Sequence, residues 1–205
     1  MHPNPAFRRT EIDTALTFAE GRGFGILTSA VGGEVLAAHV PFIFGAGGIE
    51  AHLVRSNPLA RALRDGALQT KLIVSGPDAY VSPDWYGEED KVPTWNYIAV
   101  HLTGELRLAD PDTLLSHLER LSERFETELP KPVWTHHKMT PGVMDKMMRQ
   151  ILPVSMSIAG VESTFKLNQN RSAEARSGAA AVIAAGGTPG METRALAGLM
   201  QAVDD

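Results

Sequence analysis

The sequence contains no cysteine, no long apolar run and no excess of positive charge. Without cysteine there is neither a disulfide framework nor thiol chemistry, so a cytoplasmic location is expected. No apolar stretch approaches the roughly 20 residues that a membrane-spanning helix requires. The opening segment "MHPNPAFRRTEIDTALTF" carries charges and prolines where a signal peptide needs an apolar core. We therefore expect neither a secretory signal nor a membrane partner.

The charge balance is acidic, with a net charge of −5 and a pI near 5.8. Binding nucleic-acid phosphates needs a basic face, so this balance argues against a broad DNA-binding surface and leaves a local basic patch open. Of the 205 residues, 43% are hydrophobic and 21% are charged, which is ordinary for a globular protein. The chain therefore fits one generous domain, or one domain with a helical appendage.

Glycine-rich turns separate the apolar runs of the stretch "GFGILTSAVGGEVLAAHVPFIFGAGGIEAHLV". Such turns indicate consecutive antiparallel hairpins. In the third run, alternate residues are expected to share one face: Ile49, Ala51 and Leu53. Further strands are predicted for "KLIVSG", "AYVS", residues 96–108 and "LPVSMSIAGV". Six or seven strands in hairpins predict a mainly β, α+β fold, either a β-barrel or a strongly curved sheet with helices outside.

Helices are predicted between and after these strands. The first begins near Thr10, is stopped by Gly21 and Gly23, and presents one apolar face: Ile12, Leu16 and Ala19. A clear amphipathic helix follows Asp110 and has one apolar stripe: Leu114, Leu118, Leu121 and Phe125. A helix from Thr140 should bury a methionine-rich stripe: Met144, Met147, Met148 and Ile151. Two alanine-rich helices, separated by "GGTPG", are expected in the tail.

The stretch "AHLVRSNPLAR" is the first candidate for a binding site. Asn57 and Pro58 are typical residues for a helix cap and a first helical position. The free amides at the start of a helix suit a phosphate, and Arg55 adds a bidentate donor. The alternative is that Arg55 simply ends a strand in solvent.

A second candidate lies at the start of the strand in "VPTWNYIAVHLTGEL". Pro93 delays the strand, which should begin after it. Trp95, Asn96 and Tyr97 then place two polar-tipped rings and an amide at the strand entrance, where burial is costly without partners. These residues form either an amphipathic plug at the end of a sheet or the binding surface for a planar ligand.

Other kinds of chemistry find less support. His136 and His137 are adjacent and would not both reach one metal ion, and no zinc motif or nucleophile elbow is present. Half-buried histidines that bind a ligand or a carbonyl group are a better interpretation of His39, His52 and His101. We therefore expect no metal site and assign no catalytic residue.

Several motifs together resemble one known family. In order, they are "MHPNPAFR", "AAHVPF", "AHLVRSNP", "SGPDAYVSPDWYG", "VPTWNYIAVHLTGEL" and "KLNQNR". They resemble the PaiB-type FMN-binding negative transcriptional regulators, which are related to the pyridoxamine-phosphate-oxidase-like split barrels. The resemblance covers residues 1–186, which we predict to be the FMN-binding split-barrel domain, and leaves 187–205 as a divergent helical tail.

The resemblance implies a six-stranded antiparallel split barrel with flanking helices, a homodimer, and FMN bound between the subunits. Carried onto this sequence, the phosphate would lie near Arg55, Ser56 and Asn57, and the flavin ring near Trp95, Asn96 and Tyr97. The pocket would be lined by His39, Pro41, His52, Leu53 and Val54. The resemblance also implies that Lys166, Gln169 and Arg171 close the site from a subunit edge. One departure is the segment "TFKLNQNR", where the family has "KWKLSQNR".

The resemblance leaves three functions open. The family name implies a transcriptional regulator, yet the sequence shows no helix-turn-helix and no basic stripe. An FMN-dependent oxidoreductase acting on a small molecule is the alternative, since the cofactor would carry the chemistry. A haem-binding or flavin-free sensor on the same barrel comes third.

Overall fold

The computed structural model describes residues 1–203. Its strands are β1 (Phe24–Val31), β2 (Glu34–Gly45), β3 (Gly48–Val54), β4 (Leu68–Val81), β5 (Thr94–Leu108), β6 (Ile151–Met156) and β7 (Gly160–Lys166). Its α-helices are α1 (Ile12–Arg22), α2 (Pro58–Ala62), α3 (Leu114–Glu126), α4 (Val143–Met148), α5 (Ala173–Ala185) and α6 (Thr193–Gln201). None of the helices in residues 1–203 is long and apolar enough to cross a bilayer.

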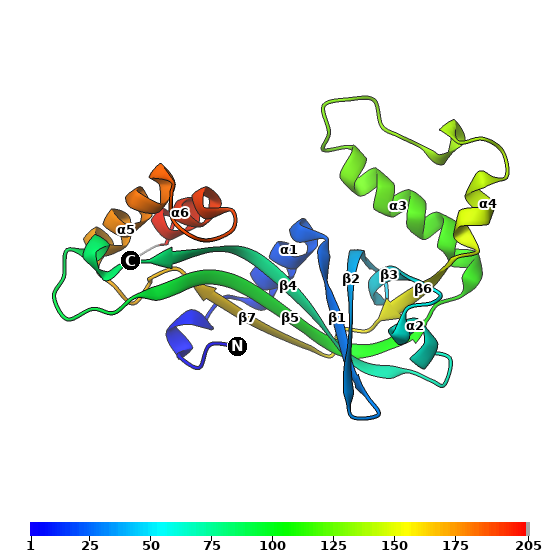
Figure 1. The fold of residues 1–205 in the computed structure, drawn as a ribbon, viewed down its shortest axis with the longest axis horizontal. Helices are drawn as coiled ribbons and strands as arrows, with labels where there is room; N and C mark the ends of the chain where they lie inside the picture. The colour runs from blue at the N-terminus through cyan, green and yellow to red at the C-terminus, as the bar shows by residue number, and fades with distance from the viewer. Residues whose placement is uncertain (204–205) are drawn as a thin grey trace. The chain divides into compact units, whose positions relative to one another are not determined.

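The seven strands form one sheet in the order β4-β1-β2-β3-β6-β5-β7, and a further pairing joins β4 to β5 (Figure 1). The β1–β2, β2–β3, β3–β6, β5–β6 and β1–β4 pairs are all antiparallel. Six strands therefore follow one another in a ring, and β7 extends the sheet beside β5. The predicted antiparallel split barrel with flanking helices is confirmed.

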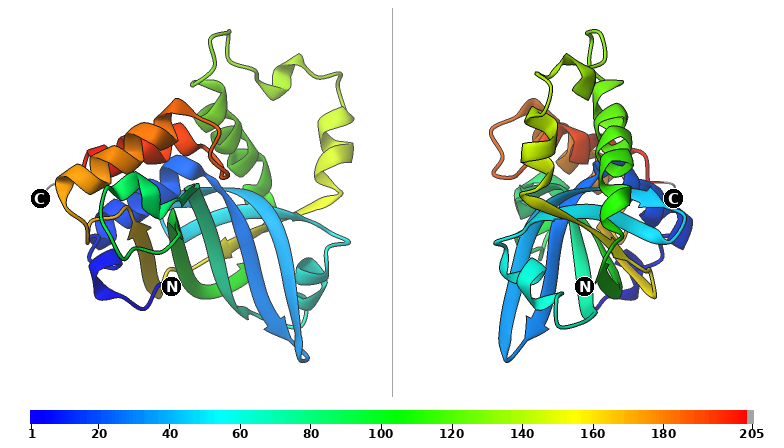
Figure 2. Two further views of the ribbon diagram at one scale, coloured as in Figure 1. Left: turned by 60° about the vertical axis from the view of Figure 1, so that its left-hand side comes forward. Right: turned by 90° about the vertical axis from the view of Figure 1, so that its right-hand side faces the viewer.

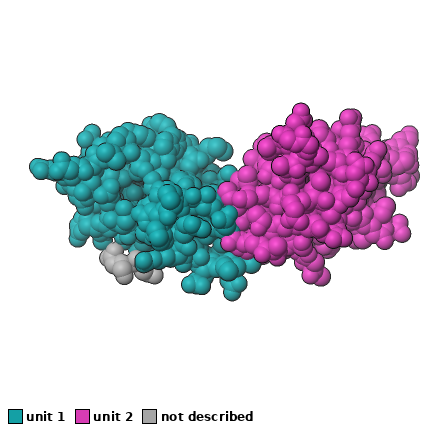
Figure 3. Space-filling model, turned by 90° about the horizontal axis from the view of Figure 1, so that it is seen from below, with its two compact units in different colours: residues 1–18, 75–100, 162–205 teal, residues 19–74, 101–161 magenta. Residues whose placement is uncertain are grey.

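The chain divides into two compact units, shown in Figure 3. Unit 1 contains residues 1–18, 75–100 and 162–205, and unit 2 contains residues 19–74 and 101–161. The long strands β4 and β5 each contribute residues to both units. The predicted boundary at residue 186 falls within unit 1 and stays a prediction, and the last two residues of the predicted tail, 204–205, lie outside the described residues.

Unit 2 has its core inside the curved sheet. Along β3 the burial alternates as expected, and Ile49, Ala51 and Leu53 are each 2% exposed. They meet inward residues of the neighbouring strands, including Phe42 and Val154. Helix α3 packs against β2, β3 and β6 from outside, because its apolar stripe carries the buried Leu114 and Leu121.

Unit 1 buries its core between the sheet and the two C-terminal helices. Helices α5 and α6 lie side by side (Figure 2). Their alanines allow close approach, and Ala179, Ile183, Leu196 and Met200 are all fully buried in a cluster with Ile98 of β5. The cluster is continuous across both helices, so α6 forms part of the hydrophobic core of unit 1.

Four details of the sequence prediction were wrong. The segments "KLIVSG" and "AYVS" belong to one strand, β4, because the intervening "GPD" stays extended. The run "LPVSMSIAGV" ends one strand and begins another, β7. Gly21 lies inside α1, and the helix ends at Arg22, just before Gly23, which has a φ of +56°. Ile12, which was predicted on the apolar face of this helix, is 59% exposed. Helix α4 has no buried residue, and Met147 is 57% exposed.

Because Leu196 is fully buried in unit 1, we predict that Leu196→Ala lowers the free energy of unfolding by about 2–4 kcal/mol. Leu199 on the same helix is 38% exposed, so Leu199→Ala should change it by less than about 0.5 kcal/mol. Urea unfolding followed by circular dichroism measures both variants. Equal effects of the two substitutions would show that residues 187–205 are an appendage outside the core.

Candidate functional site

The turn between β3 and α2 carries the predicted phosphate-binding residues. Asn57 caps the helix, and its Oδ1 accepts a hydrogen bond from the Leu59 amide at 2.9 Å. Arg55 is exposed, and its Nε donates to the Arg149 carbonyl at 2.6 Å. Ser56 is exposed between them. Helix α2 has only 5 residues, so its dipole is small and any phosphate binding here depends mainly on the Arg55 side chain.

His39 and Pro41 lie on the outer face of the β1–β2 hairpin. The register places Phe24 opposite Pro41 and Ile26 opposite His39. The His39 ring is exposed and stacks on the Phe24 ring, with 6.4 Å between the ring centroids. Phe24 is 54% exposed and Val35, farther along the same face, is 74% exposed. The two predicted residues therefore belong to an exposed, largely apolar sheet face.

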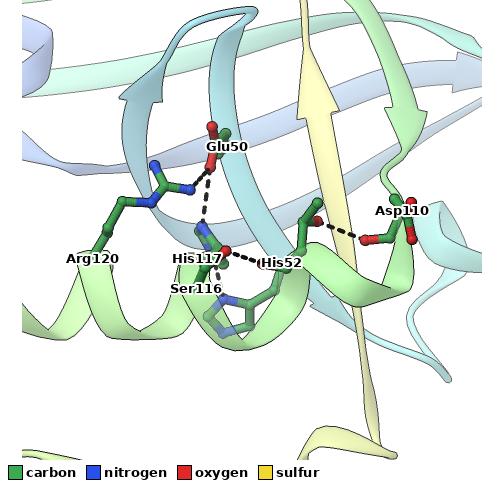
Figure 4. A network of polar contacts seen from close by, with 7 residues as sticks. Glu50, His52, Asp110, Ser116, His117 and Arg120 are labelled. Atoms are coloured by element: carbon green, nitrogen blue, oxygen red, sulfur yellow. Dashed lines mark hydrogen bonds and ion pairs between the residues drawn. The ribbon is translucent and has the colours of Figure 1, made fainter.

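His52 takes part in a polar network on the outer face of β3 (Figure 4). Its Nδ1 lies 3.2 Å from Nε2 of His117 on α3, and the two rings are nearly perpendicular, at 66°. On the opposite side of the His117 ring, Nδ1 lies 3.8 Å from Oε2 of Glu50. The Arg120 Nη2 donates to that same carboxylate oxygen at 2.5 Å. The two strand residues are thus joined through a single helix residue.

Burial dominates the electrostatics of this network. His117 is 2% exposed. Its burial, with the neighbouring charge of His52 acting in the same direction, lowers its pKa from 6.5 to about 4, although Glu50 opposes the shift. Burial also lowers the pKa of His52. Both imidazoles are therefore neutral near pH 7. A hollow of about 260 Å³ opens beside His117 and is lined in part by Glu50, His117 and Arg120.

Trp95, Asn96 and Tyr97 alternate along β5 in unit 1. Trp95 is 46% exposed, and its ring packs edge-on against Tyr80, with the centroids 6.2 Å apart. Asn96 is fully buried, and its Nδ2 lies 3.4 Å from Sδ of Met200. Tyr97 is half-buried. The plug interpretation thus describes the buried Asn96, whereas the indole of Trp95 remains available to a ligand.

The departure at Asn168 has a local structural reason. Asn168 has a φ of +62°, a left-handed conformation that asparagine tolerates better than most residues. Its Oδ1 accepts a hydrogen bond from the Tyr86 hydroxyl at 3.4 Å.

Two of the predicted residues of this segment make local contacts. Gln169 accepts a hydrogen bond from the Leu167 amide and donates one to the Phe165 carbonyl, so its side-chain amide stabilises its own loop. Lys166 contacts the Thr94 hydroxyl, and burial followed by the charge of Arg171 lowers its pKa.

Two of the predicted cofactor-binding residues, Leu53 and Asn96, are buried inside their units. The others are exposed or half-buried: His39, Pro41, His52, Val54, Arg55, Ser56, Asn57, Trp95 and Tyr97.

Sequence reasoning missed His117, Glu50 and Arg120. A signal was present, because His117 lies between Leu114 and Leu121 on the buried stripe of α3, where a histidine needs a polar partner. Within residues 1–203, no three histidine or acidic side chains are arranged to hold a metal ion.

The lowered pKa of His117 predicts a stability that falls in mild acid. The unfolded chain protonates this histidine below about pH 6.5, whereas the folded protein does so only near pH 4. The free energy of unfolding should therefore fall by about 2–3 kcal/mol from this residue as the pH drops between those values. Urea unfolding at several pH values measures it, and His117→Gln should remove this part of the dependence.

The control is His137→Gln, which changes an exposed histidine and should follow the native pH dependence. If His117→Gln also follows the native curve, His117 is not held neutral in the fold.

Comparisons with known proteins identify the family. Residues 1–160 match the model of the family described as "Putative FMN-binding domain". The chain is 29% identical over 170 residues to the "Protease synthase and sporulation protein PAI 2" of Bacillus subtilis, with 80% of each chain covered.

Solved structures show the same fold. The FAD and haem binding protein of Mycobacterium smegmatis matches with a TM-score of 0.59 at 15% identity, covering 90% of this chain and 83% of that one. The flavocytochrome Anf3 of Azotobacter vinelandii matches with a TM-score of 0.55 at 14% identity, covering 80% and 72% respectively. The family match confirms the predicted resemblance to PaiB and the expectation of a flavin cofactor. The chain belongs to the FMN-binding domain family of split-barrel proteins.

Proposed function

We propose that this protein is an FMN-binding regulator of the PaiB type and that it works as a homodimer. The observation that carries the proposal is the family match, which spans residues 1–160 and so includes the β3–α2 turn and the β5 entrance. The regulatory role is supported by the similarity to the sporulation protein PAI 2. The absence of cysteine supports the expected cytoplasmic location, which stays a prediction.

The residues of the turn and of the β5 entrance fit FMN. Arg55 is an exposed guanidinium at the end of a strand, with the exposed Ser56 hydroxyl beside it, and together they supply donors for a phosphate. Trp95 offers a half-exposed indole to a planar ring. When bound, FMN supplies redox chemistry, and the protein positions it and controls its surroundings. Within unit 2, the buried Leu53 would support the turn from behind, and within unit 1 the buried Asn96 would support the β5 entrance.

The exposed face of the β1–β2 hairpin supports the homodimer. Phe24 and Val35 are large apolar residues with exposures of 54% and 74%, and paired strands place Ile26 and Pro41 on the same face. An apolar sheet face that is exposed in the monomer is a typical protein–protein interface. His39 and Pro41 lie on this face, so a second subunit covering it would meet two of the predicted cofactor-binding residues. This agrees with FMN binding between subunits, as the resemblance implies.

An oxidoreductase is the second candidate, and the network of His52, His117 and Glu50 favours it. These groups can hold or pass a proton, and His52 lies only three positions before Arg55. Oxidation of NAD(P)H by the FMN-loaded protein with an added acceptor, set against binding of a promoter fragment at near-physiological salt, separates the two functions.

For FMN binding, we predict that the dialysed protein binds one FMN per chain in a fluorescence titration. Arg55→Ala should weaken binding by about 1.5–3 kcal/mol, the usual contribution of a charged hydrogen bond. Arg61→Ala removes another exposed arginine six positions away and serves as the control. Thermal unfolding of both variants without FMN separates lost binding from lost stability. Equal affinity of the native protein and Arg55→Ala would refute the phosphate assignment.

For the homodimer, we predict that Val35→Asp converts the protein to monomers, because it places a charge in an apolar interface. Ile12→Asp is the matched control. Ile12 is 59% exposed at the start of α1, where an acidic residue is favourable. Analytical ultracentrifugation at micromolar concentration measures the mass of each variant. A Val35→Asp protein that remains dimeric would place the interface elsewhere.

A further inference from the structure

The contacts of His117 limit the positions of the protons on the two histidines to two arrangements. Neutral imidazole carries one N–H and one bare nitrogen, so the 3.2 Å contact between His117 Nε2 and His52 Nδ1 has one donor and one acceptor. The remaining His117 nitrogen, Nδ1, is buried and has no hydrogen-bond partner among the described residues. Its nearby charged neighbour is the Glu50 carboxylate, 3.8 Å away.

Of the two possible arrangements, electrostatics favours one. If His117 carried its proton on Nε2, the bare Nδ1 would direct a lone pair toward the Glu50 carboxylate, and the two would repel each other. With the proton on Nδ1, the N–H dipole points toward the carboxylate and the interaction is attractive. Nε2 is then the acceptor, so His52 must donate from Nδ1. The second nitrogen of His52, Nε2, is left without a proton.

The position of Glu50 is itself fixed. Arg120 binds its Oε2, and the side chain lies over Gly45 on the neighbouring strand. A Cβ at Gly45 would collide with the Glu50 carboxylate, so glycine is needed there for Glu50 to take this position. The charged groups that face His117 are thus Glu50 from β3 and Arg120 from its own helix, together with the titratable His52.

We propose that Glu50 and His117 are positioning residues that hold His52 in a single neutral tautomer, and that the bare Nε2 of His52 accepts a hydrogen bond from an O–H or N–H group of the bound flavin. The second half of this inference rests on the proposed function. Figure 4 shows the far side of the His52 ring pointing away from the network, and the ring is only half-buried. An acceptor of this kind selects a donor, such as a ribityl hydroxyl or a ring N–H, and disfavours a carbonyl oxygen.

The first test uses the flavin-free protein. Two-dimensional ¹⁵N–¹H NMR of the imidazole rings distinguishes the tautomers, and the loss of signals in His52→Gln assigns His52. We expect His52 in the native protein to be protonated on Nδ1. Glu50→Gln should produce a mixture of tautomers, because the carboxylate no longer orients His117. Glu105→Gln is the control, since Glu105 is another strand carboxylate paired with an arginine, Arg107.

A His52 that is protonated on Nε2 in the native protein would overturn the proposal, as would an unchanged tautomer in Glu50→Gln.

The second test measures FMN affinity by fluorescence titration. His52→Leu removes the acceptor and should weaken binding about tenfold, a typical effect of losing one hydrogen bond. His52→Gln keeps a carbonyl acceptor and should lose less than about threefold. Equal affinity of the native protein and His52→Leu would overturn the acceptor role while leaving FMN binding established. If the native protein does not bind FMN, the proposed function and the acceptor role both fail, whereas the tautomer from the first test still decides the proton assignment.

Discussion

The alternation of side chains along β3 is the constraint on which the rest of unit 2 depends. Ile49, Ala51 and Leu53 face inward and build the core, so Glu50 and His52 must face outward. A shift of register by one residue would exchange the two sets and put a carboxylate and an imidazole into the core. The hydrophobic core and the polar network are therefore two sides of the same strand.

The outward face of β3 also explains the character of α3. A helix that covers a polar strand face cannot be apolar along its whole stripe, because the strand residues would lose their partners. His117 replaces an apolar residue in the stripe and contacts both Glu50 and His52. Burial keeps it neutral, which avoids placing a charge between helix and sheet. The helix thus packs on the outside of the sheet through the buried Leu114 and Leu121, and its one imidazole gives His52 a hydrogen-bond partner.

Much of the fold was predictable because it depends on local patterns. Glycine turns and alternating apolar residues located β1, β2 and β3, and Asn57 with Pro58 located α2. The errors arose where tertiary contacts decide. The "GPD" segment of β4 reads as a turn, yet Gly76 lies against Phe18 and Ile98, where any side chain would collide, so the strand continues through it. Likewise, the methionine stripe of α4 predicts a buried helix face, but none of its methionines is buried and Met147 is 57% exposed.

The candidate site was predictable only in part, for a similar reason. Arg55 and Trp95 could be found because their type and local position suggest exposed binding groups, and both are exposed. Glu50, His117 and Arg120 come from segments far apart in the sequence, and only the packing of α3 on β3 brings them together.

The contrast between Asn96 and His52 shows what separates a structural polar group from a candidate ligand-binding one. Both were predicted to line the flavin site. Asn96 is enclosed by the α5–α6 side of unit 1, with Met200 Sδ as its neighbour, so its amide is committed to the interior. His52 has one nitrogen engaged by His117 and a ring that is only half-buried. Because a buried partner orients the His52 ring, its second nitrogen can offer a ligand a hydrogen-bond acceptor in a fixed direction. The enclosed amide of Asn96 cannot reach a ligand in this way.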